Sequence, residues 1–215
     1  MYPRSITAPD VTASAPPAGG AACRALWTVE RSFDRVFGGE ANPLRHLGAL
    51  GFFLFWIMIA TGAYLFVFYD TSIEGAYHSM ERLAEEQPYA GGVMRSLHRY
   101  AADAFVLVVV LHLLRELVLG RFRGFRWFSW VSGVPLLWLM FASGVVGYWL
   151  AWDRLAQFVA VATTEWLDWL PFFGAPLARN FVARESVGER LFTLLMFVHI
   201  SVPLVLLAGM YVHIQ

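Results

Sequence analysis

The chain has 215 residues, of which 58% are hydrophobic and 16% aromatic, and its formal net charge is zero. This composition is too apolar for an ordinary soluble domain, and the balanced charge gives no sign of nucleic-acid binding. The single cysteine, Cys23, excludes an internal disulfide, a cysteine-cluster metal site and a cofactor attached through a C-x-x-C-H motif. We therefore expect a membrane protein that holds any cofactor without thiols.

Residues 1–44 precede the strongly apolar part of the chain. The stretch TAPDVTASAPPAGGAA is Pro-rich and lacks the plan of a cleaved signal peptide, which predicts a disordered cytoplasmic tail. The next stretch, CRALWTVERSFDRVFGG, places apolar residues on one helical face with arginines beside them. That pattern favours an amphipathic helix on the membrane surface, with a poorly ordered linker as the alternative.

Residues 45–215 contain four segments that suit transmembrane helices, each of which needs about 20 mainly apolar residues. They cover about 47–68, 93–119, 128–150 and 191–212. The fold class expected is therefore an all-α membrane protein with a bundle of four transmembrane helices. The long connection at 151–188 is rich in tryptophan and predicts short amphipathic helices on the outer surface.

The distribution of arginine predicts the orientation of the bundle. Arginines precede the first span and fill the connection between the second and third, whereas the loop between the first two spans is net acidic. Arginine-rich short loops face the cytoplasm. We expect a multi-pass protein of the bacterial cytoplasmic membrane with both termini cytoplasmic.

Two spans carry histidines separated by the same interval of fourteen residues. His98 and His112 lie in the second span, and His199 and His213 in the fourth. Fourteen residues of α-helix advance about 21 Å and return the side chain to within about 40° of the same face. Because both spans run from outside to inside, His98 should be level with His199, and His112 level with His213.

The first and third spans carry glycines at this interval and run in the opposite direction. Their direction sets Gly62 and Gly147 level with the outer histidines, and Gly48 and Gly133 level with the inner ones. Each level then offers two imidazoles and two helices without a side chain. This arrangement suits a flat macrocycle ligated on both faces, with glycines letting the backbone approach its plane.

The histidine pattern therefore predicts two stacked, non-covalent b haems. Their irons would be bound by His98 with His199 and by His112 with His213. Zinc fits poorly because it needs four ligands at one site. Packing histidines or a proton relay are the alternative interpretation of histidines in a membrane helix.

Arginines near the histidines suit the anionic propionates of haem. Arg95 and Arg99 flank His98, and Arg115 follows His112. Arginine binds carboxylates in a bidentate manner. The alternative is that these side chains reach from the span ends to the lipid headgroups.

From about residue 43 onward the sequence resembles the N-terminal half of cytochrome b, in particular cytochrome b6. The segments that carry the resemblance are TGAYLFVFY, RSLHR, HLLR, SWVSG, GVVGYWLAWD, PFFGAPL and SVGERLF, followed by H-x3-P-x9-H from His199 to His213. The resemblance implies the same haem ligands, with Arg95, Arg99 and Arg115 supporting propionates. It also implies a homodimer.

The sequence departs from the family in several places. Ala151-Trp152 replaces a Pro-Trp pair, and Leu194 replaces an arginine before the fourth span. His46 stands where cytochrome b6 has a cysteine for an additional haem. Asp103 replaces a small residue, and we expect it either to be paired within the bundle or to belong to a proton path.

These observations favour an electron-transfer subunit rather than a chain with catalytic residues of its own, since a bis-histidine haem has no open axial position. It would carry electrons between a quinone pool and iron–sulfur, cytochrome c-type or separate C-terminal-half cytochrome b subunits of a respiratory or photosynthetic complex. Quinone exchange is expected near His112 and His213, and quinol oxidation that splits its electrons between two pathways is expected to need the partner subunits. The alternatives are a membrane anchor for a peripheral dehydrogenase and a haem-free transporter or scaffold.

Overall fold

The computed structural model describes residues 20–169, 182–183 and 186–214. These residues form seven α-helices and one short β-hairpin. The helices are α1 Ala21–Phe37, α2 Leu47–Phe68, α3 Ala76–Glu86, α4 Val93–Val118, α5 Trp127–Trp149, α6 Arg154–Asp168 and α8 Glu189–Ile214. The strand β1 Val182–Ala183 pairs antiparallel with β2 Ser186–Val187. Most of the predicted N-terminal tail and the PFFGAPL segment lie outside the described residues.

Helices occupy all four segments that were predicted to span the membrane. Among the described residues, α2, α5 and α8 are long and apolar enough to cross a bilayer. The 26-residue α4 is not among these three, and it carries Arg95, Arg99, Asp103, Arg115 and Glu116. The prediction of membrane spans is thus confirmed for three helices, and α4 as a fourth span remains a proposal.

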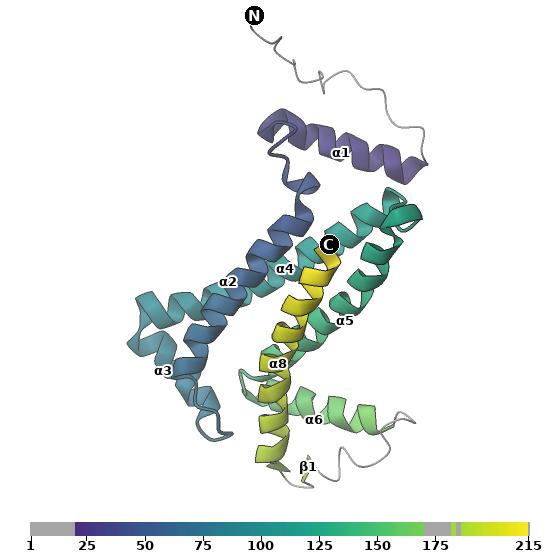
Figure 1. The fold of residues 1–215 in the computed structure, drawn as a ribbon. Helices are drawn as coiled ribbons and strands as arrows, with labels where there is room; N and C mark the ends of the chain where they lie inside the picture. The colour runs from purple at the N-terminus through teal and green to yellow at the C-terminus, as the bar shows by residue number, and fades with distance from the viewer. Residues whose placement is uncertain (1–19, 170–181, 184–185, 215) are drawn as a thin grey trace, which may run out of the picture.

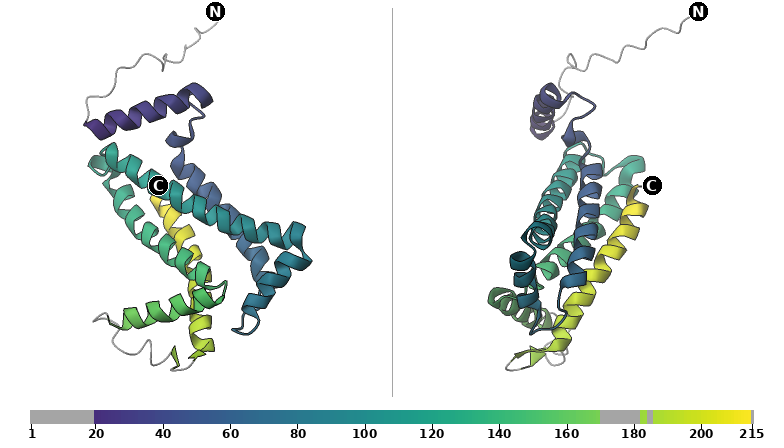
Figure 2. Two further views of the ribbon diagram at one scale, coloured as in Figure 1. Left: turned by 180° about the vertical axis from the view of Figure 1, so that it is seen from behind. Right: turned by 90° about the vertical axis from the view of Figure 1, so that its left-hand side faces the viewer.

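The four long helices form two antiparallel pairs, α2 with α4 and α5 with α8, which lie side by side (Figure 2). Short turns set the start of two of these helices. Asn42 accepts a hydrogen bond from the backbone N–H of Leu44 in the turn before α2, and Gly124 supplies the positive φ of 70° needed before α5.

The two ends of the bundle carry different elements (Figure 1). The amphipathic α1 lies across the end that also holds the α4–α5 connection and the end of α8. The opposite end carries α3, α6 and the β-hairpin. The helix predicted within 23–39 is therefore present as α1, and one of the short helices predicted within 151–188 is present as α6, whereas α3 was not anticipated.

A buried layer joins all four long helices at the middle of the bundle. It contains one residue from each helix, namely Phe55, Phe105, Met140 and Leu206. Each of them lies midway between the two glycines or the two histidines of its own helix, seven residues from either one. Because lipid is as apolar as these side chains, close packing rather than removal from water holds the layer together.

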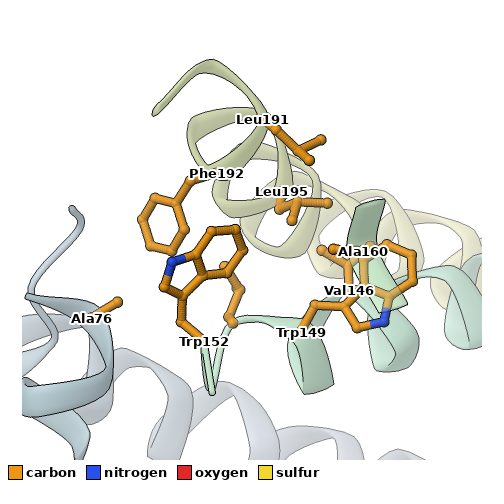
Figure 3. Packing of buried hydrophobic residues seen from close by; sticks show 9 residues of the cluster. Ala76, Val146, Trp149, Trp152, Ala160, Leu191, Phe192 and Leu195 are labelled. Carbon is orange, nitrogen blue, oxygen red and sulfur yellow. The ribbon is translucent and has the colours of Figure 1, made fainter. Parts of the chain in front are cut away.

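A second apolar cluster closes the end of the bundle near α3 and α6 (Figure 3). Its centre is the indole of Trp152, which meets the Phe192 ring edge-on with centroids 4.8 Å apart. Ala76 of α3 and Ala160 of α6 are fully buried against this cluster. The surface helices at this end are therefore attached to the bundle by apolar packing.

Candidate functional site

The histidines of α4 lie against the glycines of α2. A Cβ atom added to Gly62 would lie 3.0 Å from Cε1 of His98, and one added to Gly48 would lie 3.6 Å from Cε1 of His112. The first distance is shorter than ordinary van der Waals contact. The prediction that these glycines also let the backbone approach a macrocycle stays a prediction, and in the structure they give room to the imidazole rings.

The same relationship holds between α5 and α8. A Cβ atom added to Gly133 would lie 3.1 Å from Cε1 of His213. Gly147 lies against His199 so closely that a Cβ atom there would overlap the imidazole ring. The fourteen-residue register predicted from the sequence thus places each histidine beside one glycine of the helix that pairs with its own.

The two histidines predicted for the outer level face each other across the bundle. The ring centroids of His98 and His199 are 6.3 Å apart, and the ring planes meet at 78°. A first-row metal bonds an imidazole nitrogen at about 2.0 Å, so two such nitrogens on opposite sides of one ion lie roughly 4 Å apart. The distance from nitrogen to ring centre is then added on each side. The sum agrees with the observed distance between the two ring centroids, which therefore suits one metal ion between the rings.

Hydrogen bonds fix the orientation of His98. Its Nδ1 atom lies 3.1 Å from the carbonyl oxygen of Met58 and 3.0 Å from Oγ1 of Thr61. The Thr61 hydroxyl already donates to the carbonyl of Ile57 at 2.7 Å, so its oxygen is free to accept. Both neighbours therefore accept from an Nδ1–H group, which leaves the lone pair of Nε2 for a metal.

The histidines of α8 are oriented in the same way. Nδ1 of His199 lies 3.0 Å from the carbonyl oxygen of Ser143. Nδ1 of His213 lies 3.0 Å from Oγ of Ser132, whose hydroxyl donates to the carbonyl of Ser129. Each ring again donates from Nδ1, so the tautomer with a free Nε2 is the one that these contacts stabilise.

The positions of the accepting carbonyls explain why glycine is needed. Met58 precedes Gly62 by four residues, and Ser143 precedes Gly147 by four. In an α-helix the carbonyl of residue i−4 bonds the N–H of residue i and keeps a second lone pair. Without a Cβ at the glycine, an imidazole can reach that lone pair. Each glycine thus opens a helix backbone to one histidine.

The inner histidines line a cavity of about 720 Å³. This volume lies within the range of about 300–1,000 Å³ that is typical of ligand pockets. His112 and His213 share its wall with Glu116, Arg121 and Arg126. No hydrogen bond to His112 is found in the described part of the chain. Its neighbour Gly48 is the second residue of α2, so no turn of this helix precedes it to supply a carbonyl oxygen. His112 is therefore less constrained than the other three histidines.

The two predicted propionate arginines near His98 take different positions. Arg95 is partly buried, and its guanidinium donates to the carbonyl oxygen of Met80 at 3.4 Å. Arg99 is exposed on the surface of α4. No ion pair of its side chain is found among the described residues. Arg95 is therefore the better placed of the two for an anionic group inside the bundle.

The third predicted arginine, Arg115, is already held by carboxylates. It donates to Glu30 of α1 at 2.8 Å and to Glu116 at 3.1 Å, and its side chain is 12% exposed. Glu116 also accepts from Arg121 at 2.9 Å. Arg115 thus attaches α1 to the end of α4, a role that the sequence did not indicate.

Two further polar residues near the inner end, Arg45 and His46, also have partners within the chain. Arg45 pairs with Asp34 of α1 at 2.7 Å, and Nε2 of His46 lies 2.8 Å from the carbonyl oxygen of Glu40. The first contact attaches α1 to the turn before α2, and the second lies within the connection between the two helices. They place Arg45 and His46 at the junction of α1 with the bundle.

Sequence reasoning missed the hydroxyl groups that orient two of the histidines. Thr61 comes directly before Gly62, and Ser132 directly before Gly133. In each of two spans, a residue with a hydroxyl group stands next to a glycine of the fourteen-residue interval. This pattern could have revealed the two hydroxyl groups. The role of the carbonyls could not be seen in the sequence, because every residue has one.

The four histidines fit a bis-histidine haem at each level better than another metal. No three His, Cys, Asp or Glu side chains gather as a metal cluster within residues 20–169, 182–183 and 186–214. Two ligands at a level suit an iron whose other ligands come from a porphyrin. The outer ring separation suits one iron ion between the two imidazoles, and the inner histidines line a cavity.

A sequence profile described as "Cytochrome b/b6/petB" matches residues 34–215. The chain belongs to the cytochrome b family. The resemblance read from RSLHR, HLLR and the neighbouring segments is thereby confirmed. The family and the three apolar helices identify an integral membrane protein of electron transport.

One solved structure similar to this chain is titled "Hyperthermophilic respiratory Complex III". The two share 24% sequence identity with a TM-score of 0.70, over 80% of this chain and 46% of the other. At this identity the similarity shows the cytochrome b fold alone. The chain spans about half the length of the solved chain that it matches.

Proposed function

We propose that this chain carries electrons across a membrane through two b haems. The observation that carries the proposal is the pairing of four histidines at two levels, three of them with Nδ1 engaged by α2 or α5. Haem bound by these histidines would supply reversible one-electron chemistry. The protein holds three of the imidazoles in one tautomer. Two histidine ligands to each haem would leave no free ligand position at the iron, which favours electron transfer over reaction there.

We propose that different arginines hold the propionates at the two levels. Arg95 is the candidate at the outer level because its side chain is partly buried, whereas the side chain of Arg99 is exposed. At the inner level Arg121 and Arg126 are among the residues that line the cavity, whereas Arg115 is not and donates instead to Glu30 and Glu116. Arg115 would then act on the inner site through Glu116 rather than by direct contact.

We propose that quinone exchanges electrons at the end that holds His112 and His213. Besides the proposed propionate arginines, this end carries the carboxyl group of Glu116 in the cavity wall and the side chains of Arg45 and His46 in the turn before α2. Cationic groups can bind a quinone carbonyl, and a carboxyl group nearby can exchange protons with it. The outer end offers an apolar cluster instead, built around Trp152 and Phe192.

The partners that we propose are other subunits of a quinol-linked redox complex in a bacterial cytoplasmic membrane. The similar solved chain belongs to a respiratory Complex III. Iron–sulfur or cytochrome c-type subunits, and a chain equivalent to the C-terminal half of cytochrome b, would complete such a complex. A homodimer and cytoplasmic termini complete the proposal, the latter because the arginine-rich loops lie at the α1 end.

Quinol-driven reduction of the b haems in native membranes tests this function. Addition of a quinol should produce the reduced b-type spectrum, and His213→Ala should slow or abolish reduction at the inner level. Haems that accept electrons from dithionite but never from a quinol would contradict a quinone-linked role. Reduction that requires a peripheral dehydrogenase and its substrate would instead favour the membrane-anchor alternative.

A further inference from the structure

One face of α4 points away from the bundle. Its side chains are exposed by 68% at Tyr100, 59% at Leu107, 39% at Leu111 and 49% at Leu114. Asp103 is exposed on the same face. The intervals between these five positions are three or four residues, which is the spacing of a stripe along one side of a helix.

Asp103 lies near the middle of the bundle in depth. His98 is level with Gly62 on the antiparallel α2, and Asp103 lies five residues further along α4. Five residues advance about 7.5 Å, which brings Asp103 to the level of Ile57. Ile57 is at the centre of α2, a helix of 22 apolar residues that is able to cross a bilayer.

The carboxyl group of Asp103 has no hydrogen bond or ion pair in the part of the chain that the structure describes. Its nearest charged neighbour along the same helix is Arg99, one turn toward the outer end. The two alternatives predicted for Asp103, pairing within the bundle and a place on a proton path through it, do not agree with its exposure. A carboxyl group that faces hydrocarbon at this depth is costly and is normally paired.

We propose that the Tyr100–Leu114 face of α4 binds a transmembrane helix of another subunit, which presents a basic side chain to Asp103. Only a helix satisfies its own backbone at this depth. A lysine or arginine would neutralise the carboxylate and bond to it. Apolar side chains of the partner would pack along the leucines on either side. The proposal rests on α4 being a membrane span.

A second copy of this chain fits the face less well. A two-fold axis along the membrane normal brings the same residues of two copies of α4 together. Asp103 would then face Asp103 of the other copy, and like charges at close range disfavour the ionised form of both. A different subunit with the opposite charge avoids this conflict.

Site-specific photocrosslinking in native membranes tests the proposal. A benzophenone amino acid replaces Leu107 in the full chain, and the irradiated adduct is identified by peptide mass spectrometry. The expected product joins this chain to a transmembrane segment of a different subunit that contains lysine or arginine. The adduct should be lost in Asp103→Leu and kept in Tyr100→Leu, which changes the same face but leaves the charge.

Several results would overturn the interface. The crosslink could form only to lipid, to a second copy of the chain, or to a segment without a basic residue. The adduct could also survive Asp103→Leu. Exchange of the charges, with Asp103→Lys and an acidic residue in the partner, should restore an adduct lost in either single variant. This second measurement keeps the test valid if Asp103→Leu assembles poorly.

A labelling experiment separates failure of the interface from failure of the span. Leu107→Cys in a Cys23→Ser background is treated with a membrane-impermeant maleimide. We expect no labelling. Labelling from water would show that this part of α4 is outside the bilayer and would overturn both proposals. Protection without a protein adduct would overturn the interface alone and leave the proposed span intact.

Discussion

Phe105 on α4 packs against Phe55 on α2, with ring centroids 6.0 Å apart, halfway between the two histidine levels. Met140 and Leu206 complete this layer. The layer therefore lies between the two proposed haem sites. It also joins the α2–α4 pair to the α5–α8 pair at the centre of the bundle.

Truncation of this layer should destabilise the protein strongly. Phe105→Ala removes a ring that is 6% exposed and leaves a cavity at the junction of all four helices. We expect a loss of about 3–5 kcal/mol in stability, as is typical of such truncations. Thermal denaturation in detergent, followed by loss of soluble protein, measures it. Phe66→Ala, which truncates a ring that is 52% exposed on α2, should change little.

A methyl group at Gly147 should displace His199. The Cβ atom would overlap the imidazole ring, so the ring or the helix must move. We expect Gly147→Ala to lose the outer haem or to alter its spectrum while the inner haem is kept. Gly144→Ala is the matched control, because a Cβ atom there has no neighbour within 4 Å. Equal behaviour of the two variants would contradict the role assigned to Gly147.

Removal of the positive charge of Arg95 should lower the reduction potential of the outer haem. A cation near the haem favours the form that has gained an electron, so its loss favours the oxidised form. An interaction of about 1 kcal/mol corresponds to roughly 40 mV for one electron. Redox titration of Arg95→Leu measures the change, with the exposed Arg82 on α3 as the control position. An unchanged titration of both haems would assign Arg95 to lipid headgroups.

Disruption of the Arg115–Glu30 ion pair should loosen α1. The two side chains are only 12% and 14% exposed, so Glu30→Gln leaves a poorly solvated arginine with Glu116 as its remaining partner. We expect a loss of about 1–3 kcal/mol in the attachment of α1. Faster proteolysis between α1 and α2 in intact vesicles would reveal it. Glu40→Gln, at an exposed position outside α1, should leave the cleavage rate unchanged.

The sequence predicted the main features of the fold because helical periodicity is strict. Fourteen residues return to nearly the same face, so the matched intervals of histidine and glycine specified which residues meet. Length and apolarity located the four long helices to within one or two residues at each end. The surface helix α3 was missed because its residues are polar and carry no membrane signal.

The details of the site depended on information that the sequence does not contain. The Nδ1 acceptors are backbone carbonyls of Met58 and Ser143, which any residue supplies. Arg115 was expected at a propionate, but its side chain meets Glu30, 85 residues away in the chain. Asp103 was expected to be paired within the bundle or to belong to a proton path, and the rotation of α4 about its axis decides that it is exposed. Contacts between distant segments determined each of these outcomes.

The haem content of the purified protein, with and without His112, tests the central claim most directly. Quantification of haem against protein, with reduced-minus-oxidised spectra, should give two b haems per chain in the wild type and one in His112→Ala. The haem that remains should be the one held by His98 and His199. A wild-type chain with one haem or none, or a His112→Ala variant that keeps both, would contradict the account.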